Sequence, residues 1–128
     1  MSIIVPPNYG SIEDLEKLHV HCVQPNQADN QDIRPLIVGI LNIMPNLEGY
    51  EFNLLHPLGR SIIQVVPVWL KLKSHSYKSA DPSHLEKNYI TYEEAMLEGL
   101  DGLIITGAAV GKLPFDEIKY WPEVQSIF

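Results

Sequence analysis

The sequence has little cysteine, few basic residues and no long hydrophobic run. Cys22 is the only cysteine among 128 residues, which excludes an internal disulfide and a zinc site built from several cysteines. The longest apolar run, residues 36–43, is far shorter than the roughly 20 residues of a membrane-spanning helix. The first ten residues lack the basic region and the cleavage site of a secretory signal. These absences predict a cytoplasmic protein in a reducing compartment.

Acidic residues outnumber basic ones, with 16 Asp and Glu against 9 Lys and Arg and a formal net charge of -7. A field of this sign repels phosphate backbones, so nucleic acid is not a predicted partner. The hydrophobic fraction of 45% and the charged fraction of 20% are ordinary for a globular protein. Length and composition together predict one small domain with its own core.

Three apolar segments rich in β-branched residues predict a buried parallel sheet, at residues 36–43, 62–70 and 102–106. Pro67 has no amide proton, so we expect it at a bulge or at an unpaired edge. Residues 48–58, between the first two segments, have helical apolar spacing, and Gly59 is expected to end that helix in the left-handed conformation. Alternating strands and helices predict a doubly wound α/β fold.

Two further helices are predicted towards the end of the chain. Residues 91–94 have the form of a capping box, with Gly99 as the stop signal of the helix that follows. Residues 121–128 predict another helix, with Pro122 suited to its first turn.

Upstream of the sheet the signals are shorter. Ser11 is the expected N-cap of a helix that runs to Leu18, and residues 19–23 alternate like a short outer strand. Residues 24–34 form a polar connector, and residues 71–88 are expected to be a long polar segment without regular structure, which is often functional.

In an open parallel sheet, ligands bind beyond the carboxyl ends of the strands. One of the loops expected there contains Gly107, Ala108 and Gly111, small residues that let backbone amides approach an oxyanion or an acyl group. An ordinary strand-to-helix turn has the same pattern. The glycine spacing differs from the dinucleotide fingerprint, so no nicotinamide cofactor is predicted. The three candidate loops are residues 42–51, 71–79 and 106–112.

Other reactive side chains are interpreted as structural. His19 and His21 would share a face of a strand, but no third ligand follows nearby, so no metal site is predicted. Cys22 has no partner base, which favours packing over nucleophilic catalysis. The remaining histidines are expected to be solvated and the aromatic residues near the later strands to be packing residues. These are His56, His75, His84, Tyr89, Tyr92, Tyr120 and Trp121.

Residues 33–45, with the sequence IRPLIVGILNIMP, resemble a characteristic segment of the homoserine O-acyltransferase family. The resemblance continues in order along nearly the whole chain. It includes Glu51, residues 53–55, His84, Leu85, Tyr89, residues 101–108, Tyr120 and Trp121.

The resemblance implies a flavodoxin-like fold of the class I glutamine amidotransferase type and a homodimer. It also implies transfer of an acetyl or succinyl group from acyl-CoA to homoserine in methionine biosynthesis. Acyl-CoA is then a substrate, and no cofactor is implied. The family uses a cysteine thioester, a histidine base and a glutamate, all beyond the position that matches Phe128. Residues 1–128 are therefore expected to be a partial domain that is inactive alone, with residues 1–33 as an extension and residues 34–128 as the first strand-helix units.

Gly111 matches a loop position where the family's glycine is associated with room for a succinyl group, and glutamate with acetyl preference. The resemblance thus implies an acyl-donor or substrate site at Gly111, Gly107 and Ala108. The sequence departs from the family just after Pro45, where relatives usually have a lysine and a Thr-Glu pair. This chain has Asn46, Leu47, Gly49 and Tyr50 there. Two alternatives therefore stay open: a serine O-acetyltransferase of cysteine biosynthesis, and a non-catalytic module that binds a partner.

Overall fold

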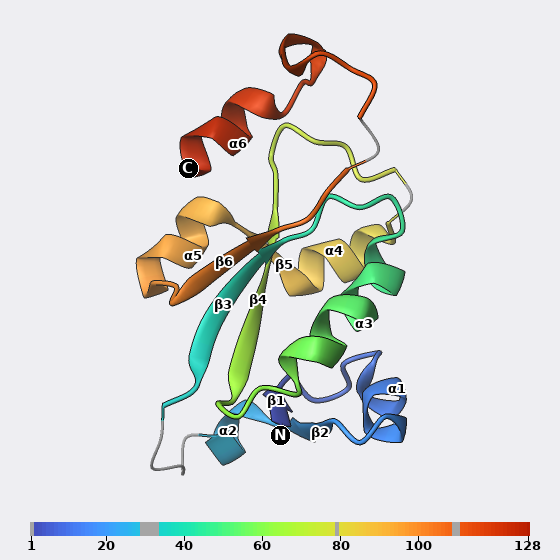
Figure 1. Ribbon diagram of the computed structural model, residues 1–128, viewed down its shortest axis with the longest axis vertical. Helices are drawn as coiled ribbons and strands as arrows, with labels where there is room; N and C mark the ends of the chain where they lie inside the picture. The colour runs from blue at the N-terminus through green and yellow to red at the C-terminus, as the bar shows by residue number, and fades with distance from the viewer. Residues whose placement is uncertain (1, 29–33, 79, 109–110) are drawn as a thin grey trace.

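The computed structural model describes residues 2–28, 34–78, 80–108 and 111–128 (Figure 1). Its strands form one parallel sheet in the order β2-β1-β4-β3-β6, and β5 also pairs with β4. The predicted α/β class with a parallel sheet is confirmed and is consistent with a flavodoxin-like fold. The strands are β1 (Ser2–Ile4), β2 (His21–Val23), β3 (Leu36–Leu41), β4 (Val65–Lys71), β5 (Tyr89–Thr91) and β6 (Gly102–Ile105). The helices are α1 (Ile12–Lys17), α2 (Pro25–Ala28), α3 (Leu47–Leu58), α4 (Pro82–Asn88), α5 (Tyr92–Glu98), α6 (Trp121–Ile127) and the 3-10 helix η1 (Phe115–Glu117).

The three predicted core strands correspond to β3, β4 and β6. The second strand, β4, begins at Val65 and not at Ile62 as predicted. Ile62 precedes the strand and is 97% exposed. Pro67 pairs with Val38 of β3 on one edge of β4. On the other edge, β1 pairs at Val65 and β5 begins to pair at Trp69. Within the described residues Pro67 therefore lies between these two partners, and its predicted unpaired edge position is confirmed.

The first residues of the chain are part of the sheet. β1 lies between β2 and β4, and its Ile3 is fully buried. β2 is an outer strand as predicted, but it is shorter than residues 19–23 because His19 adopts a φ of 63° in the preceding turn. The expected shared face of His19 and His21 is therefore wrong, since only His21 lies on the strand.

Helix α3 forms as predicted, but the expectation about its end is wrong. Gly59 has φ -67° and ψ -12°, which is right-handed. A β-carbon there would lie 2.3 Å from Cγ1 of Val20, so close packing is what requires a glycine. The second helix agrees with prediction: the Thr91 side chain accepts from the amide of Glu94, and Gly99 follows with φ 84°.

Two other expectations about local structure need correction. The Ser11 side chain makes no capping hydrogen bond at α1, and that helix ends at Lys17. Residues 71–88 include a helix, α4, whose N-cap Asp81 accepts from the amide of Ser83. Helix α4 was not predicted because most of its residues are polar, so the segment shows no apolar periodicity.

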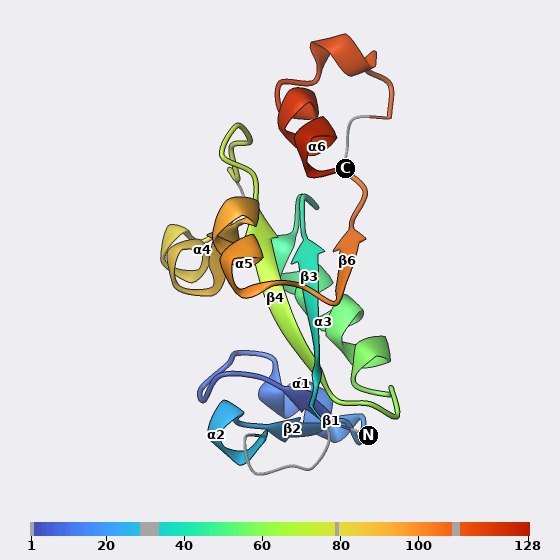
Figure 2. The same cartoon turned by 90° about the vertical axis from the view of Figure 1, so that its left-hand side faces the viewer.

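The two largest apolar clusters of the core lie on opposite faces of the sheet. Successive residues of a strand point to opposite faces, so Ile40 belongs to the cluster that includes Leu55 of α3, and Leu41 belongs to the cluster that includes Ala95 of α5. Figure 2 shows α3 and α5 on opposite sides of β3 and β4. In the described part of the chain, no helix is long and apolar enough to cross a membrane.

Candidate functional site

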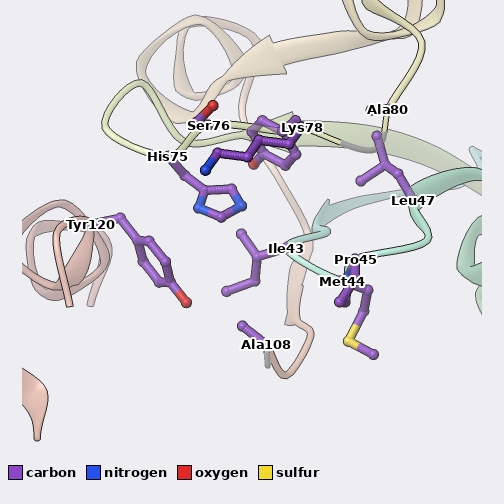
Figure 3. A pocket seen from close by; sticks show the side chains of 11 residues that line it. Ile43, Met44, Pro45, Leu47, His75, Ser76, Lys78, Ala80, Ala108 and Tyr120 are labelled. Carbon is purple, nitrogen blue, oxygen red and sulfur yellow. The ribbon is translucent and has the colours of Figure 1, made fainter. Parts of the chain in front are cut away.

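A cavity of about 230 Å³ lies where the loops after β3, β4 and β6 meet (Figure 3). This is the position at which open parallel sheets bind ligands. Ile43 and Met44 follow β3, His75 and Lys78 follow β4, Ala108 follows β6, and Tyr120 precedes α6. All three loops predicted from the sequence to bind ligands therefore contribute residues to one cavity.

Hydrogen bonds hold the loop after β3 in place. The amide of Ile43 donates to Oγ1 of Thr106 at 2.9 Å, which joins the ends of β3 and β6. The buried Asn42 side chain accepts from the amide of Met44 at 3.2 Å and donates to the carbonyl of Leu47 at 3.2 Å. Because both ends of the loop are fixed, Ile43 and Met44 form a preorganised apolar wall.

Aromatic side chains form the opposite wall. The His75 ring lies edge-on to Tyr77 and Tyr120, with centroid distances of 4.6 and 4.9 Å and interplanar angles of 86° and 82°. Tyr77 is held in turn by the amide of Leu72, which donates to its hydroxyl at 3.0 Å. Burial lowers the pKa of His75, so its imidazole is neutral at neutral pH. The expectation that His75 is a solvated loop residue is wrong.

Helix α6 is joined to the same wall by one carboxylate. Glu123 accepts hydrogen bonds from the amides of Lys73 and Ser74 at 2.9 and 2.8 Å, and from the Ser74 hydroxyl at 2.6 Å. These bonds fasten the start of α6 to the loop after β4. Tyr120, the residue before α6, is thereby held against the cavity.

The structure separates the predicted binding residues. Ala108 lines the cavity, whereas Gly107 and Gly111 are exposed and are not among the described residues that line it. Among the described residues, a β-carbon at either glycine would have no neighbour within 4 Å. Ala109 and Val110 of the same loop lie outside the described residues. Substrate contact by Gly107, Ala108 and Gly111 stays a prediction.

Cys22 lies on β2, at the end of the sheet where β1 pairs with Val65, and the cavity lies beyond the opposite ends of the strands (Figure 1). Burial, and after it the charge of Glu16, raises the pKa of the Cys22 thiol. A nucleophilic cysteine needs the opposite shift. Among the residues that the structure describes, no group of three His, Cys, Asp or Glu side chains is arranged to hold a metal ion.

A buried polar cluster lies next to the cavity, and the sequence analysis missed it. Glu51 of α3 is 1% exposed and accepts hydrogen bonds from the hydroxyls of Tyr9 and Tyr89, the latter at 3.0 Å. His84 of α4 is also bonded to it, with Nε2 2.7 Å from Oε2. The Tyr89 hydroxyl accepts from Asn42 at 3.2 Å, which connects the cluster to the loop that lines the cavity.

One signal could have identified Glu51. It lies four residues after Leu47 and four before Leu55, on the face of α3 that both leucines bury. A carboxylate on a buried helical face needs partners. Its partners come from three other segments, so their identity could not be read from the local sequence. The expectation that His84 is solvated is also wrong.

Comparisons with known proteins give a consistent result. The model of the family described as homoserine O-succinyltransferase matches residues 2–128. A homoserine O-acetyltransferase of Lysinibacillus sphaericus (strain C3-41) is 39% identical over 127 residues, which are 99% of this chain and 41% of that protein. Proteins with the same name from Geobacillus kaustophilus and Petrotoga mobilis (strain DSM 10674 / SJ95) are 39% and 37% identical to this chain. The aligned regions include 99% of this chain and 42% and 41% of those two proteins. The chain thus spans about two fifths of these curated relatives.

Proposed function

Because the chain belongs to the homoserine O-succinyltransferase family, we propose that it forms the acyl-donor part of an O-acyltransferase. The reaction moves an acetyl or succinyl group from acyl-CoA to the hydroxyl of homoserine, at the start of methionine biosynthesis. The relatives named above carry the name homoserine O-acetyltransferase, and the family model carries the succinyl name. Both acyl groups are therefore part of the proposal.

The observation that carries the proposal is the cavity at the carboxyl ends of β3, β4 and β6. Ile43, Met44 and Ala108 give it apolar walls that suit the hydrocarbon part of an acyl group. Lys78 lines the same cavity and supplies a positive charge that can pair with a carboxylate or a phosphate of the donor.

We assign acyl binding to this chain and the covalent step to residues outside positions 1–128. Family resemblance implies a cysteine thiolate that attacks the thioester of acyl-CoA, so that CoA leaves as its thiol and an acyl-cysteine thioester forms. The acceptor hydroxyl then attacks this thioester, which yields the ester and restores the cysteine thiol. Cys22 does not suit that role, because its thiol lies on an outer strand and burial raises its pKa. The chain contributes the walls of the acyl site in this proposal.

Two measurements on the purified chain test the proposal. Calorimetric titration with acetyl-CoA and succinyl-CoA should show binding, and mass spectrometry should show no acylated product from homoserine or serine. Ala108→Trp should abolish binding, because an indole would fill the cavity. Leu97→Trp places the same side chain at a position that is 88% exposed on α5 and should bind normally.

Each outcome has a defined meaning. If neither acyl-CoA binds, or if Ala108→Trp binds as the wild type does, the cavity is not the acyl site. If product forms, the covalent step takes place within these 128 residues. Product from serine but not from homoserine would replace the proposed acceptor with serine.

A further inference from the structure

Tyr120 carries a buried hydroxyl that has no hydrogen-bond partner. The residue is 7% exposed, and its hydroxyl oxygen is inaccessible to solvent and unbonded within the described part of the chain. Buried polar groups are almost always paired, because removing such a group from water without a partner costs free energy. An unpaired hydroxyl in a binding cavity therefore suggests a partner that arrives with the ligand.

Tyr120 lines the cavity, and its hydroxyl points towards other residues that line it (Figure 3). Figure 3 shows the Tyr120 ring pointing from the α6 side towards Ile43 and Ala108, with the His75 ring beside it. Burial raises the pKa of Tyr120, so the hydroxyl keeps its proton at neutral pH and can act as a donor.

The orientation of Tyr120 is fixed from two sides. The His75 ring packs against the Tyr120 ring in a T-shaped arrangement, with a centroid distance of 4.9 Å. Glu123, in the first turn of α6, binds the amides of Lys73 and Ser74, close in sequence to His75. Preorganised donors of this kind lose little entropy when a ligand binds.

The surroundings limit what the hydroxyl can bind. Ile43, Met44 and Ala108 offer no hydrogen-bonding side-chain atom apart from a weakly accepting thioether. A small apolar group with one acceptor oxygen satisfies both the walls and the hydroxyl. The acyl group of a thioester has this composition: a hydrocarbon part and one carbonyl oxygen.

We propose that Tyr120 is a substrate-binding residue whose hydroxyl donates a hydrogen bond to the carbonyl oxygen of the acyl group, and that His75 is a positioning residue which holds Tyr120 in that orientation. The inference rests on the proposed function for its choice of ligand. It goes further by assigning recognition of the acyl carbonyl to one side chain.

The direct test compares acetyl-CoA with CoA, which lacks the acyl group, in calorimetric titrations of the purified chain. The wild type should bind acetyl-CoA more tightly than CoA. Tyr120→Phe should weaken acetyl-CoA binding by about 5- to 10-fold, the loss expected for one neutral hydrogen bond, and should leave CoA binding unchanged. Tyr50→Phe, on the exposed surface of α3, should change neither affinity.

The role of His75 is tested with a pair of variants. His75→Ala removes the ring that packs on Tyr120 and should weaken acetyl-CoA binding selectively, as Tyr120→Phe does. His75→Phe keeps an aromatic ring at that place and should restore the preference for acetyl-CoA over CoA. Equal loss in both variants would mean that the imidazole itself binds the ligand and would overturn the positioning role.

Thermal melting without ligand gives an independent readout. Tyr120→Phe should melt at or above the wild-type temperature, because it removes a buried hydroxyl without a partner. Tyr77→Phe should melt lower, because its hydroxyl accepts from the amide of Leu72. If Tyr120→Phe melts as low as Tyr77→Phe, the hydroxyl has a structural partner and the inference fails.

Failure of the inference can be told apart from failure of the proposed function. If acetyl-CoA binds equally well to the wild type and Tyr120→Phe, the inference is wrong and the acyl-CoA site stands. If the wild type does not bind acetyl-CoA, O-acetylhomoserine is titrated as a probe that carries an acyl carbonyl without CoA. Binding of that probe that depends on Tyr120 would support the inference, and absent or unchanged binding would overturn it.

Discussion

Oε2 of Glu51 and Nε2 of His84 lie 2.7 Å apart in the interior, where the Glu51 side chain is 2% exposed and the His84 side chain 20% exposed. Tyr9 and Tyr89 donate to the same carboxylate. One side chain of α3 therefore connects the segment after β1, helix α4 and strand β5. Through Tyr89 and Asn42 the connection reaches the loop that lines the cavity.

Glu51→Gln should destabilise the chain. A glutamine has about the same shape, but its amide nitrogen can only donate, so it cannot satisfy the hydroxyl donors that meet both carboxylate oxygens. We expect a loss of about 1–3 kcal/mol in the free energy of unfolding, the range for a buried group left without a partner. Urea unfolding followed by circular dichroism measures it. Glu48→Gln, at an exposed position of the same helix, serves as the control, and equal midpoints for the two variants would contradict the prediction.

Stability should fall as the pH rises above about 10. Burial, and after it the Glu51 charge, raises the pKa values of Tyr9 and Tyr89 well above their usual range, and burial raises the pKa of Tyr77 to about 12. An unfolded tyrosine loses its proton near pH 10, so at higher pH the folded state binds more protons and its stability declines. The stabilisation is complete below pH 10 and is lost as the pH rises through the folded values.

Urea midpoints between pH 8 and pH 11 test this alkaline decline. Tyr89→Phe should show a shallower decline than the wild type, because one group with a raised pKa is removed. Absorbance at 295 nm should show fewer than the six tyrosines of the sequence ionising in the folded chain near pH 10. A constant midpoint across the range would contradict the prediction.

How far the sequence predicts this fold depends on how local each signal is. β3 could be predicted because an apolar run of that length is buried on both faces wherever it lies in the sheet. β1 could not, because three residues carry no periodicity and Ile3 is buried through its place in the sheet and in a core cluster built from distant segments. A buried strand of this length is fixed by long-range contacts.

The same distinction applies to the candidate site. The three loops could be predicted from a general rule about the carboxyl ends of parallel strands, and Ala108 lines the cavity. Tyr120 and His75 were expected to be a packing aromatic and a solvated histidine. Their roles depend on the placement of α6 against the loop after β4 by Glu123, a contact between segments about 50 residues apart in the chain that local sequence does not encode.

Asp101 should stabilise the chain above pH 4 and lose that effect in acid. Its carboxylate accepts two hydrogen bonds from Arg34 at 2.9 Å and one from the amide of Ile37 at 2.8 Å. These hydrogen bonds lower the pKa of Asp101 to about 2, and those from Arg34 contribute more than the one from Ile37. An unfolded aspartate titrates near pH 4, so the stabilisation is present above that value and is lost as the pH falls through 2.

Asp101→Asn should therefore unfold more easily than the wild type at pH 5, and the difference should shrink towards pH 2. Urea midpoints at several pH values measure this convergence. Asp116→Asn, on the exposed η1 helix, is the control and should follow the wild type. A difference between Asp101→Asn and the wild type that stays constant from pH 5 to pH 2 would show that titration of Asp101 does not contribute.

Gly59→Ala should destabilise the chain through a steric clash with Val20. The backbone at Gly59 is right-handed and can accept any residue, so conformational strain is not the reason. The added β-carbon would lie 2.3 Å from Cγ1 of Val20, a residue that is 1% exposed and cannot move into solvent. Overpacking of this kind costs about 1–3 kcal/mol.

A double-mutant cycle tests the mechanism: with Val20→Ala as the background, Gly59→Ala should cost less than in the wild type, because the clashing methyl group is gone. Gly10→Ala, where a β-carbon would meet no described atom within 4 Å, should change the urea midpoint little in either background. If Gly59→Ala costs the same with valine or alanine at position 20, the contact between α3 and the segment before β2 is not what requires this glycine.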